Sequence, residues 1–334
     1  MIKVGLIGCG FMGSMHANCY KAMEGKAKVT AVADLREEYA REAAALSGAV
    51  IYSEGADLIE NADVDFVDIC LPSYLHATYA IMAMKKGHHV FVEKPLCLTR
   101  EEAAALLKVQ EETGRMAQVG QLVRFWDEYK WLKQVKDSGI YGKVVSGTFR
   151  RLSPRPEWAW ENWLHDPKKS GGMALDLHVH DVDYIRYLLG EPKEIRAVGM
   201  EETPGSGLTE HILTTYIYDD AVIHAEGCWN YPADYRFSMY YNVKFEKATV
   251  VYDSGTNEFV VYLAQGGKFT PKIEDRFEGS AGSGNISSLG GYYNELLYFV
   301  NLLENPEMEQ LATRKEGARS VELALEGIEK ALER

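Results

Sequence analysis

The sequence has little of what marks a secreted or membrane protein. Its five cysteines are odd in number and scattered, and no two form a Cys-x-x-Cys pair. We therefore expect reduced thiols and a cytoplasmic location. No stretch approaches the ~20 apolar residues that a membrane span needs. The opening residues, MIKVGLIG, already predict a buried strand, so we expect no signal peptide before the fold.

Basic residues are also scarce. The 334 residues include 36 lysines and arginines against 49 aspartates and glutamates, which gives a formal net charge of -13. This balance argues against nucleic acid and acidic membrane surfaces as partners. The chain is long enough for two domains, and it can bury a large core without disulfides or metals.

Short apolar runs alternate with helical patterns in the first third of the chain. Four runs are nearly continuous in hydrophobic residues: 2–8, 28–34, 64–72 and 88–95. Strands that are covered on both faces have this pattern. Thr99 and Glu102 form a capping box at the start of one intervening helix. The alternation predicts an α/β fold with a doubly wound parallel sheet in a first domain, residues 1–122.

The pattern changes after about Phe125, where we expect a second, α+β domain over residues 123–334. The expected elements are a helix over 127–139, a strand over 143–152 and mostly β structure from 193 to 264, with a hairpin turning at Asp219 and Asp220. A Gly/Ser-rich segment at 278–291 is most simply a flexible connection, and a lid over a site is the alternative.

The strands of 193–264 have few helices between them, so one face of their sheet lacks a cover within the chain. We predict that this face carries Tyr216, Tyr218, Phe237 and Tyr241, or their alternating neighbours. An exposed apolar patch commonly marks an interface, and a symmetric face-to-face contact would bury it. The protein should therefore be a homodimer or homotetramer that assembles through this sheet.

A glycine-rich loop, Gly-Cys-Gly-Phe-Met-Gly, occupies residues 8–13. It follows a predicted strand and opens a helix, which is the context of the dinucleotide fingerprint. Gly8 permits the tight turn, Gly10 lets a pyrophosphate approach the backbone, and Gly13 lets the helix sit close to the sheet. The helix N-terminus then offers free N–H groups to the phosphates. The alternative is a glycine-rich turn without a ligand.

Asp34, at the end of the second predicted strand, indicates which nucleotide binds. Its carboxylate can accept hydrogen bonds from both ribose hydroxyls and would repel a 2′-phosphate. Arg36 is close in sequence and could soften that repulsion. We therefore expect NAD as the cofactor, with NADP less favoured. Cys9, inside the loop, is interpreted as a small space-filling residue rather than a nucleophile.

Two further predicted strands end in unusual sequences. One runs into Leu-Pro-Ser-Tyr-Leu-His at 71–76, and another into Glu93-Lys94-Pro95. Ligands of doubly wound sheets bind beyond the carboxyl ends of the strands, and Pro95 biases Lys94 away from helical geometry. Taken alone, Lys94 would more often be a surface charge. The remaining candidate contacts to the cofactor are Phe11, Met12, Arg36, Leu71, Pro72, His76, Glu93, Lys94 and Gln121.

Residues 171–190, GGMALDLHVHDVDYIRYLLG, crowd titratable groups at the start of an apolar helix. Asp176 and His180 are four apart and would share one helix face. His178 would point elsewhere, and Asp181 and Asp183 would fall near the outer side. One alternative is a solvated helix start. The other is a metal site of His178, His180 and a carboxylate, but residues two apart on a helix diverge, so we expect no metal.

These motifs together resemble the Gfo/Idh/MocA family, which includes glucose–fructose oxidoreductase and inositol dehydrogenase. The matching segments, in order, are GLIGCGFMG, Asp34, CLPSYLH, VEKPL and SGGMALDLHVHDVDYIRYLLG, which span about residues 1–190. The resemblance implies an N-terminal Rossmann domain and a C-terminal domain with a large open, mostly antiparallel sheet. It also implies NAD(P)-dependent chemistry on sugars, cyclitols or related polyols. Many members have Thr and Asn where this chain begins Leu71-Pro72-Ser73.

The resemblance also implies the catalytic residues. Lys94 matches the lysine of the family's Glu-Lys-Pro motif, and Asp176 and His180 match its Asp-x-x-x-His motif. Oxidation of a secondary alcohol removes a hydride from carbon and a proton from oxygen. His180 suits the general base, Lys94 can stabilise a developing alkoxide, and Asp176 can orient the hydroxyl or the imidazole. The nicotinamide takes the hydride.

Aromatic residues before and after the catalytic stretch suit a sugar ring. The candidate substrate contacts are Arg124, Trp160, Trp163, Tyr231 and Tyr235, together with Trp158. Aromatic faces stack on the C–H faces of rings, although the tryptophans could equally pack an interdomain seam and Arg124 could be a structural ion-pair partner. We expect a neutral polyol rather than a phosphorylated sugar. Two other functions remain open: an NAD-retaining glycoside hydrolase that oxidises its sugar transiently, and a non-enzymatic NAD sensor.

Overall fold

The chain forms two compact units. The computed structural model describes residues 1–201, 209–273 and 289–333. The two units are Met1–Phe125 with Phe277–Arg319, called the first unit, and Trp126–Arg276 with Ser320–Arg334, called the second unit. The first division lies close to the expected residue 122, but residues 277–319, expected in the second domain, belong to the first unit. Most of the Gly/Ser-rich segment lies outside the described residues.

The first unit contains a six-stranded parallel sheet. Its order is β3-β2-β1-β4-β5-β6, the arrangement of a doubly wound dinucleotide-binding domain. The strands are β1 Ile2–Ile7, β2 Ala27–Ala33, β3 Val50–Tyr52, β4 Phe66–Ile69, β5 His89–Val92 and β6 Ala117–Val119. The four predicted runs match β1, β2, β4 and β5. The short edge strand β3 was not predicted; its three residues, Val-Ile-Tyr, form a brief apolar run, and Val50 and Ile51 are 59% and 43% exposed.

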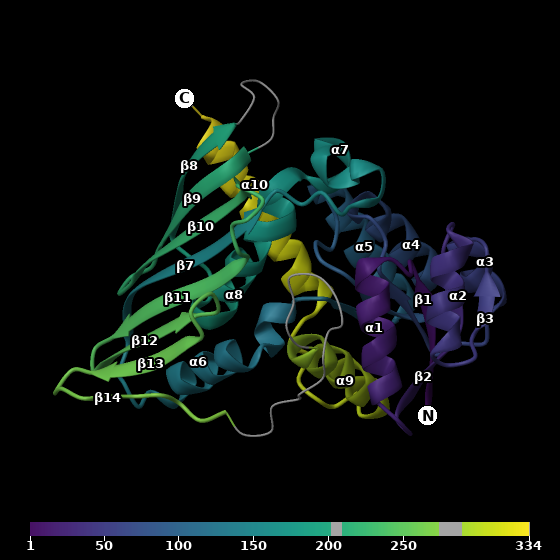
Figure 1. Cartoon of the computed structure of the whole chain (residues 1–334), viewed down its shortest axis with the longest axis horizontal. Coiled ribbons are helices and arrows are strands. Elements are labelled where there is room, and N and C mark those ends of the chain that lie inside the picture. Colours follow the sequence, from purple (N-terminus) through teal and green to yellow (C-terminus); the bar gives the residue numbers. More distant parts are fainter. Residues whose placement is uncertain (202–208, 274–288, 334) are drawn as a thin grey trace. The chain divides into compact units, whose positions relative to one another are not determined.

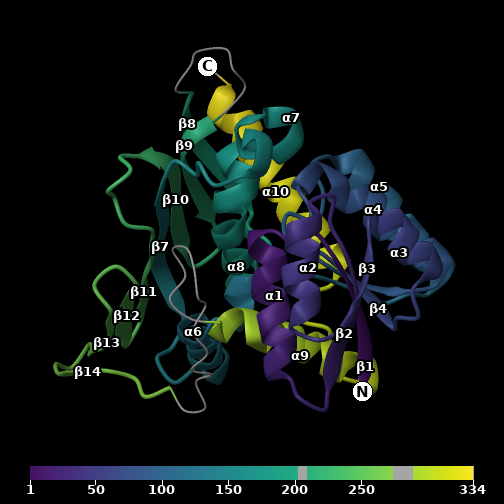
Figure 2. The ribbon, with the colours of Figure 1, turned by 45° about the vertical axis from the view of Figure 1, so that its right-hand side comes forward.

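Helices cover both faces of this sheet. They are α1 Phe11–Ala22, α2 Glu37–Ala45, α3 Gly55–Asn61, α4 Ser73–Lys86, α5 Arg100–Thr113, the short η1 Leu122–Phe125, α9 Gly290–Glu304 and the start of α10 Arg314–Leu332. Helices α1 and α9 pack side by side, and α3, α4 and α5 form another layer (Figure 2). The predicted capping box is present, because Thr99 Oγ1 accepts the Glu102 N–H at 3.1 Å.

Helix α9 belongs to the first unit because its apolar side chains pack on the parallel strands. Phe299 is fully buried, with ring centroids 5.1 Å from Phe66 and 5.8 Å from Phe91. Phe66 lies on β4 and Phe91 on β5. The contact joins residues more than 200 positions apart in the sequence, which is why local patterns gave no sign of it.

The second unit contains an eight-stranded sheet in the order β14-β13-β12-β11-β7-β10-β9-β8. The strands are β7 Val144–Pro154, β8 Glu194–Glu201, β9 Thr209–Ile217, β10 Val222–Tyr231, β11 Ser238–Phe245, β12 Ala248–Asp253, β13 Glu258–Leu263 and β14 Lys268–Phe269. Only β7 and β10 run parallel, so the sheet is mostly antiparallel. The predicted hairpin is present, since Val222 pairs with Ile217 across Asp219 and Asp220.

Helices cover one face of the eight-stranded sheet. They are α6 Asp127–Ser138, η2 Trp160–His165, α7 Pro167–Ser170, the π-helical segment η3 Ala174–His178, α8 Val179–Leu189 and the end of α10. Figure 1 shows α6 and α8 on the same side of the sheet. Their aromatic residues meet the sheet, with Tyr129 4.8 Å from Tyr184 and 5.0 Å from Tyr241 between ring centroids. None of the helices among the described residues is long and apolar enough to cross a membrane.

The opposite face of this sheet is exposed, but not with the tyrosines that we expected. Tyr216 and Tyr241 are 2% and 0% exposed and point into the covered face. Their alternating neighbours occupy the open face, where Val198, Met200 and Leu213 are 69%, 66% and 50% exposed. The prediction left two sets open, and the alternating positions are the exposed ones, because a period of two does not say which set faces the helices.

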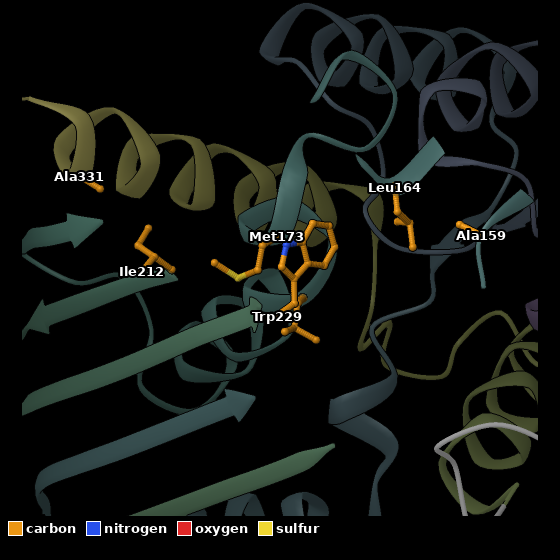
Figure 3. Close-up of a cluster of buried hydrophobic side chains, with 7 residues drawn as sticks. Ala159, Leu164, Met173, Ile212, Trp229 and Ala331 are labelled. Atoms are coloured by element: carbon orange, nitrogen blue, oxygen red, sulfur yellow. The ribbon is translucent and has the colours of Figure 1, made fainter. Parts of the chain in front are cut away.

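A cluster of apolar side chains packs the helical segments against this sheet (Figure 3). Its buried members are Ala159, Leu164, Met173, Leu177, Ile212, Trp229 and Ala331, and Trp163, Ala197 and Phe237 pack against it. Figure 3 shows the Trp229 ring beside Met173. Met173 and Leu177 flank Asp176 in sequence, so this packing anchors the segment that carries the candidate catalytic residues.

Candidate active site

The glycine loop has the geometry that nucleotide binding requires. Gly8 has a φ of +86°, and a Cβ there would lie 2.5 Å from the Cys70 carbonyl oxygen. A Cβ on Gly13 would lie 1.8 Å from the Gly8 carbonyl oxygen, so the helix can start this close to β1 only with glycine. Gly10 is the N-cap of α1 and offers no side chain to its N–H groups. Phe11 and Met12 begin that helix, and the first turn of a helix points its backbone N–H groups toward its N-terminus, where an anion can bind.

Asp34 is held at the end of β2 beside this loop. Its carboxylate accepts the backbone N–H groups of Cys9 and Arg36, both at 2.8 Å. The Arg36 side chain also contacts Asp34, with Nε 3.3 Å from Oδ1. Burial and the nearby Asp34 charge raise the pKa of the Cys9 thiol to about 12. Cys9 is therefore a neutral, space-filling residue under the loop.

His76 connects two of the predicted cofactor segments. Its Nε2 lies 2.7 Å from the Leu71 carbonyl oxygen and its Nδ1 lies 2.7 Å from that of Pro95. Burial lowers the pKa of His76, so the neutral ring donates to one of the two carbonyls at a time. The end of β4, with Leu71 and Pro72, is thereby tied to the Glu-Lys-Pro segment after β5. Gln121 follows β6 and is also buried.

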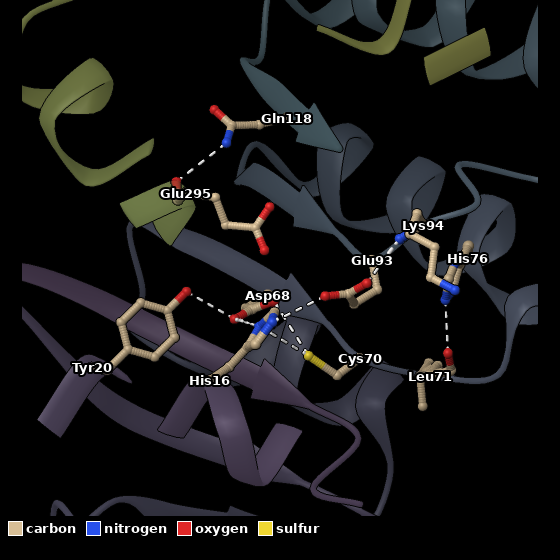
Figure 4. Close-up of polar contacts among 10 residues, drawn as sticks. All are labelled: His16, Tyr20, Asp68, Cys70, Leu71, His76, Glu93, Lys94, Gln118 and Glu295. Atoms are coloured by element: carbon tan, nitrogen blue, oxygen red, sulfur yellow. Dashed lines mark hydrogen bonds and ion pairs between the residues drawn. The ribbon is translucent and has the colours of Figure 1, made fainter. Parts of the chain in front are cut away.

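Glu93 and Lys94 lie at the end of β5, the strand edge where such sheets bind ligands. Glu93 is 5% exposed. Its Oε2 accepts the backbone N–H of Lys94 at 3.0 Å, and its Oε1 lies 3.1 Å from His16 Nε2. The carboxylate of Glu93 therefore bridges the backbone of Lys94 and the imidazole of His16 (Figure 4).

Sequence reasoning missed this buried cluster around His16, which lies on α1. The His16 Nδ1 is 2.9 Å from Asp68 Oδ2, and Tyr20 donates its hydroxyl to the same oxygen at 2.8 Å (Figure 4). Burial alone would lower the pKa of His16, but the charge of Asp68 and the hydrogen bonds to Asp68 and Cys70 raise it well above its ordinary value. The one available signal was Asp68, a carboxylate inside an otherwise apolar strand.

Helix α9 adds a further carboxyl group to this cluster. Glu295 is fully buried, and neither of its carboxylate oxygens has a hydrogen-bond partner in the described part of the chain. Burial and the charge of Glu93 raise the pKa of Glu295 well above its usual range, which favours its neutral form. Two sets have donor atoms close enough to consider a metal ion, namely His16, Asp68 and Cys70, and His16, Glu93 and Glu295.

In the second unit, Asp176 and His180 stand out by their exposure. From Gly172 to Ile185 they are the only residues that are not buried. The regular helix expected here is interrupted, because Ala174–His178 is π-helical and α8 begins at Val179. Single turns of π-helix are frequent at functional sites. The segment thus presents two accessible titratable side chains on an otherwise buried scaffold.

The neighbouring acids are buried, contrary to expectation. Asp181 is 0% exposed and accepts two hydrogen bonds from Arg151, both at 3.1 Å. Asp183 is 3% exposed and accepts the Ser320 hydroxyl at 2.7 Å. The placement of Asp181 and Asp183 near the outer side was therefore wrong, because their partners lie on distant segments that the local pattern does not reveal.

His178 is buried as well, unlike Asp176 and His180. Its Nε2 lies 3.0 Å from Thr214 Oγ1, and burial followed by the charge of Arg151 lowers the pKa of His178 to about 3. A Cβ on Gly227 would lie 2.8 Å from the His178 side chain, so the ring fits against bare backbone. His178 is a neutral core residue rather than a partner of His180.

The candidate substrate residues divide into packed and exposed groups. Arg124 is 3% exposed, donates to the Leu311 carbonyl and pairs with Glu316 at 3.1 Å, which is the structural ion-pair alternative. Trp163 packs against the apolar cluster, whereas Trp160 is 41% exposed. The remaining two, Tyr231 and Tyr235, stack on each other with ring centroids 4.2 Å apart.

The known proteins that the chain resembles are consistent with these features. A family model described as oxidoreductase family, NAD-binding Rossmann fold, matches residues 2–121, and the Gfo/Idh/MocA C-terminal domain matches residues 129–252. Inositol 2-dehydrogenase 4 of Saccharopolyspora erythraea is 30% identical over 287 residues, covering 83% of this chain and 81% of that protein. The 2,7-anhydro-N-acetylneuraminate hydratase of Escherichia coli is 29% identical over 225 residues, covering 64% and 57%.

The fold itself has close structural matches. The structure of levoglucosan dehydrogenase in complex with NADH and levoglucosan superimposes with a TM-score of 0.84 at 23% identity, covering 99% of this chain and 97% of that one. Several curated relatives match over little more than half of their own length. The chain therefore belongs to the Gfo/Idh/MocA family of oxidoreductases, whose nucleotide-binding domain is an NAD-binding Rossmann fold.

Proposed function

We propose that the protein is an NAD-dependent dehydrogenase that oxidises a secondary hydroxyl group of a sugar or an inositol-like polyol. The observation that carries this proposal is the exposure pattern of the second unit. Across Gly172–Ile185, where His178, Asp181 and Asp183 are buried, the chain leaves Asp176 and His180 accessible. A segment that served only the fold would have no need of an accessible acid and an accessible base.

The first unit holds the cofactor at the glycine loop and at the carboxyl ends of its strands. The loop N–H groups at the start of α1 bind the phosphates, and Asp34 accepts hydrogen bonds from the ribose hydroxyls. A 2′-phosphate would meet the Asp34 carboxylate, so kcat/KM is higher with NAD than with NADP. Arg36 contacts Asp34 and reduces that difference without removing it. Equal kcat/KM values for the two nucleotides would refute this assignment.

The reaction removes a hydride from carbon and a proton from oxygen, and the two go to different acceptors. NAD, when bound, would supply the acceptor for the hydride that leaves the substrate carbon. His180 removes the hydroxyl proton, a transfer worth roughly 10²–10⁴ in rate. Lys94 stabilises the negative charge that develops on the oxygen, and Asp176 orients the hydroxyl.

The substrate is a neutral ring polyol. The net charge of -13 repels anions at long range, and the glycine-loop helix start is assigned to the nucleotide. The exposed Trp160 and the stacked Tyr231 and Tyr235 offer aromatic faces to the C–H faces of a ring. A panel of cyclitols and aldoses, each with NAD and monitored by NADH absorbance, tests the function. A much higher kcat/KM for a phosphate ester than for its free polyol would overturn this substrate class.

A second function is favoured by one of the relatives. The Escherichia coli relative is named a hydratase rather than a dehydrogenase, so a member of this family can carry out a reaction that its name does not describe as an oxidation. An enzyme that oxidises its substrate only transiently would retain NAD and release no net NADH. Product formation from a glycoside without any gain in NADH absorbance would identify this alternative.

The open face of the eight-stranded sheet is the proposed assembly surface. Val198, Met200 and Leu213 expose half or more of their side chains there. A symmetric contact that buries this face gives a homodimer or, with a second interface, a homotetramer. Light scattering should therefore report an oligomer at micromolar concentration, and Leu213→Glu should shift it toward monomer. The five free thiols support a reducing, cytoplasmic location.

A further inference from the structure

The buried contacts of Glu93 connect the backbone of the proposed catalytic lysine to the interior of the first unit. Glu93 accepts the Lys94 N–H through one carboxylate oxygen and contacts His16 through the other. His16 contacts Asp68 on its opposite side. We propose that Asp68 and His16 are positioning residues for Lys94, acting through Glu93. This proposal rests on the function assigned to Lys94 above.

The geometry specifies where the protons are. Both ring nitrogens of His16 face carboxylate oxygens, at 2.9 Å and 3.1 Å. A carboxylate accepts hydrogen bonds and does not donate them, so both nitrogens carry a proton and His16 is an imidazolium ion. The resulting charge-assisted hydrogen bonds are about twice as strong as neutral ones. A buried cation clamped between two anions gives Glu93 a fixed anchor.

Glu93 has little freedom to leave this position. A Cβ on Gly120 would lie only 3.2 Å from both oxygens of the Glu93 carboxylate, so the neighbouring strand end closes the space beside it. Both carboxylate oxygens of Glu93 have partners, and Gly120 limits the space beside them. Glu93 therefore holds the backbone N–H of Lys94 in a fixed position. A displacement of about 1 Å in a catalytic group can cost roughly 100-fold in rate, so this anchoring affects turnover.

The other groups that face His16 do not replace Glu93 as its partner. They are Cys70 after β4, Tyr20 on α1, and Tyr292 and Glu295 on α9. Burial raises the pKa of the Cys70 thiol, of both tyrosines and of the Glu295 carboxyl group. The thiol and the two phenol groups are therefore neutral, and the neutral form of Glu295 is favoured, so the counter-charges that contact His16 among the described residues are Asp68 and Glu93.

Glu93→Gln tests the proposal because its effect should depend on pH. The amide of the introduced glutamine can accept the Lys94 N–H, but its oxygen is then engaged, and its NH₂ group can donate to His16 only when His16 Nε2 carries no proton. The variant therefore works best with a neutral imidazole, whereas the wild-type carboxylate works best with an imidazolium. We expect the ratio of kcat for Glu93→Gln to wild-type kcat to be about 0.01–0.1 at pH 6 and to rise toward pH 9, with a small change in KM.

Because kcat of the variant is divided by kcat of wild type at each pH, the titration of any group that affects both proteins equally cancels. A loss of turnover that is the same at every pH would indicate a merely structural role and overturn the proposal, as would a kcat within twofold of wild type at pH 6.

A matched pair of variants tests the other end of this series of contacts, where Tyr20 meets Asp68. Tyr20→Phe and Tyr241→Phe each remove one buried hydroxyl. The Tyr20 hydroxyl donates to the Asp68 carboxylate at 2.8 Å, and the Tyr241 hydroxyl donates to the backbone carbonyl oxygen of Glu128 at 2.9 Å.

Only Tyr20→Phe should lower kcat, by about 2- to 5-fold, because Tyr241 lies on β11 of the second unit. Equal effects of the two variants would contradict the proposal. A readout without turnover is the 15N NMR spectrum of labelled histidines, in which His16 should remain an imidazolium at pH 8. A neutral His16 at that pH, or a stoichiometric metal ion in the purified protein, would refute the proposal even if the dehydrogenase function stands. Absence of NADH formation by wild type would refute only the function.

Discussion

The two units bury charge in different ways. In the second unit Arg151 and Asp181 form a closed pair, with two hydrogen bonds of 3.1 Å and exposures of 3% and 0%. In the first unit His16 is surrounded by Asp68, Glu93 and Glu295, so carboxyl groups outnumber the cation. The charges of the Arg151–Asp181 pair cancel, whereas the cluster around His16 has more carboxyl groups than cations.

The difference indicates what each network does. Arg151 and Asp181 form hydrogen bonds with each other, so this pair stabilises the core and does not extend to a ligand-binding edge. Glu93 instead extends the first network to the backbone of Lys94 at the strand edge where ligands bind. An unbalanced buried cluster is costly to fold, and its retention at this edge is consistent with a catalytic use.

Arg314 provides a third case, a buried cation without a carboxylate. It is 0% exposed, and its Nη1 donates to the Leu106 carbonyl at 2.9 Å and approaches Met84 Sδ at 3.0 Å. Its Nε and Nη2 find no acceptor within the described ranges of the chain. Burial lowers the pKa of Arg314 to about 10, so it is still charged at pH 7.

Breaking the closed pair should have the largest effect. Arg151→Met leaves Asp181 as an uncompensated buried charge, which typically costs about 3–5 kcal/mol. The free energy of unfolding, measured by urea denaturation at pH 7, should fall by that amount. A loss below about 1 kcal/mol would mean that water reaches Asp181 and that the pair is not closed.

Lowering the pH should reduce the stability of the second unit, because His178 is buried in its neutral form. The unfolded chain protonates this histidine below pH 6.5, whereas the folded pKa is about 3, so stability is lost as the pH falls through that window. The shift corresponds to about 4 kcal/mol at pH 3. Thermal midpoints of His178→Gln and wild type should therefore converge on acidification. Parallel pH profiles for the two proteins would contradict a buried neutral His178.

Removing the buried cation Arg314 should raise the free energy of unfolding, whereas removing Arg151 should lower it. Arg314→Met replaces a buried charge by an apolar side chain of similar length, and such exchanges are neutral to stabilising, here by about 1–3 kcal/mol. The matched comparison is Arg151→Met, the same substitution at a paired arginine. If both variants lose stability equally, Arg314 has a counter-charge and the contrast between them fails.

At pH 4, where both forms of the chain can keep the proton of Glu295, Glu295→Gln should produce the smallest change, within about 1 kcal/mol. The raised pKa of Glu295 means that its proton contributes stability below the unfolded pKa and that this contribution is lost as the pH rises through the folded value. The glutamine side chain cannot ionise, so the variant should gain midpoint temperature over wild type at pH 8 and not at pH 4. A gain at pH 4 alone would reverse the assigned protonation of Glu295.

The sequence predicted the parts that depend on local pattern. The loop at Gly8–Gly13, the parallel strands with continuous apolar runs and the pair Asp176 and His180 follow from spacing and context. The structure added what depends on distant partners. His16 meets Asp68 across 52 positions, and Asp181 meets Arg151 across 30. No periodicity in either segment encodes such pairings.

Two further differences have the same cause. The alternation on β9 predicted one exposed set of side chains, but only the helices that pack on the sheet decide that Tyr216 is covered and Leu213 is open. Helix α9 joined the first unit through Phe299, whose partners on β4 and β5 lie far away in sequence. Tertiary packing determined both outcomes.

The most direct test of the account is single-turnover formation of NADH by three proteins under the same conditions. Wild type, Lys94→Ala and His180→Ala are saturated with NAD, mixed with a saturating polyol and followed by absorbance. We predict that the His180 variant loses roughly 10²–10⁴ in rate and that the Lys94 variant loses a comparable amount, with thermal midpoints near that of wild type. A near-normal rate for His180→Ala would contradict the assignment of the accessible base in the second unit.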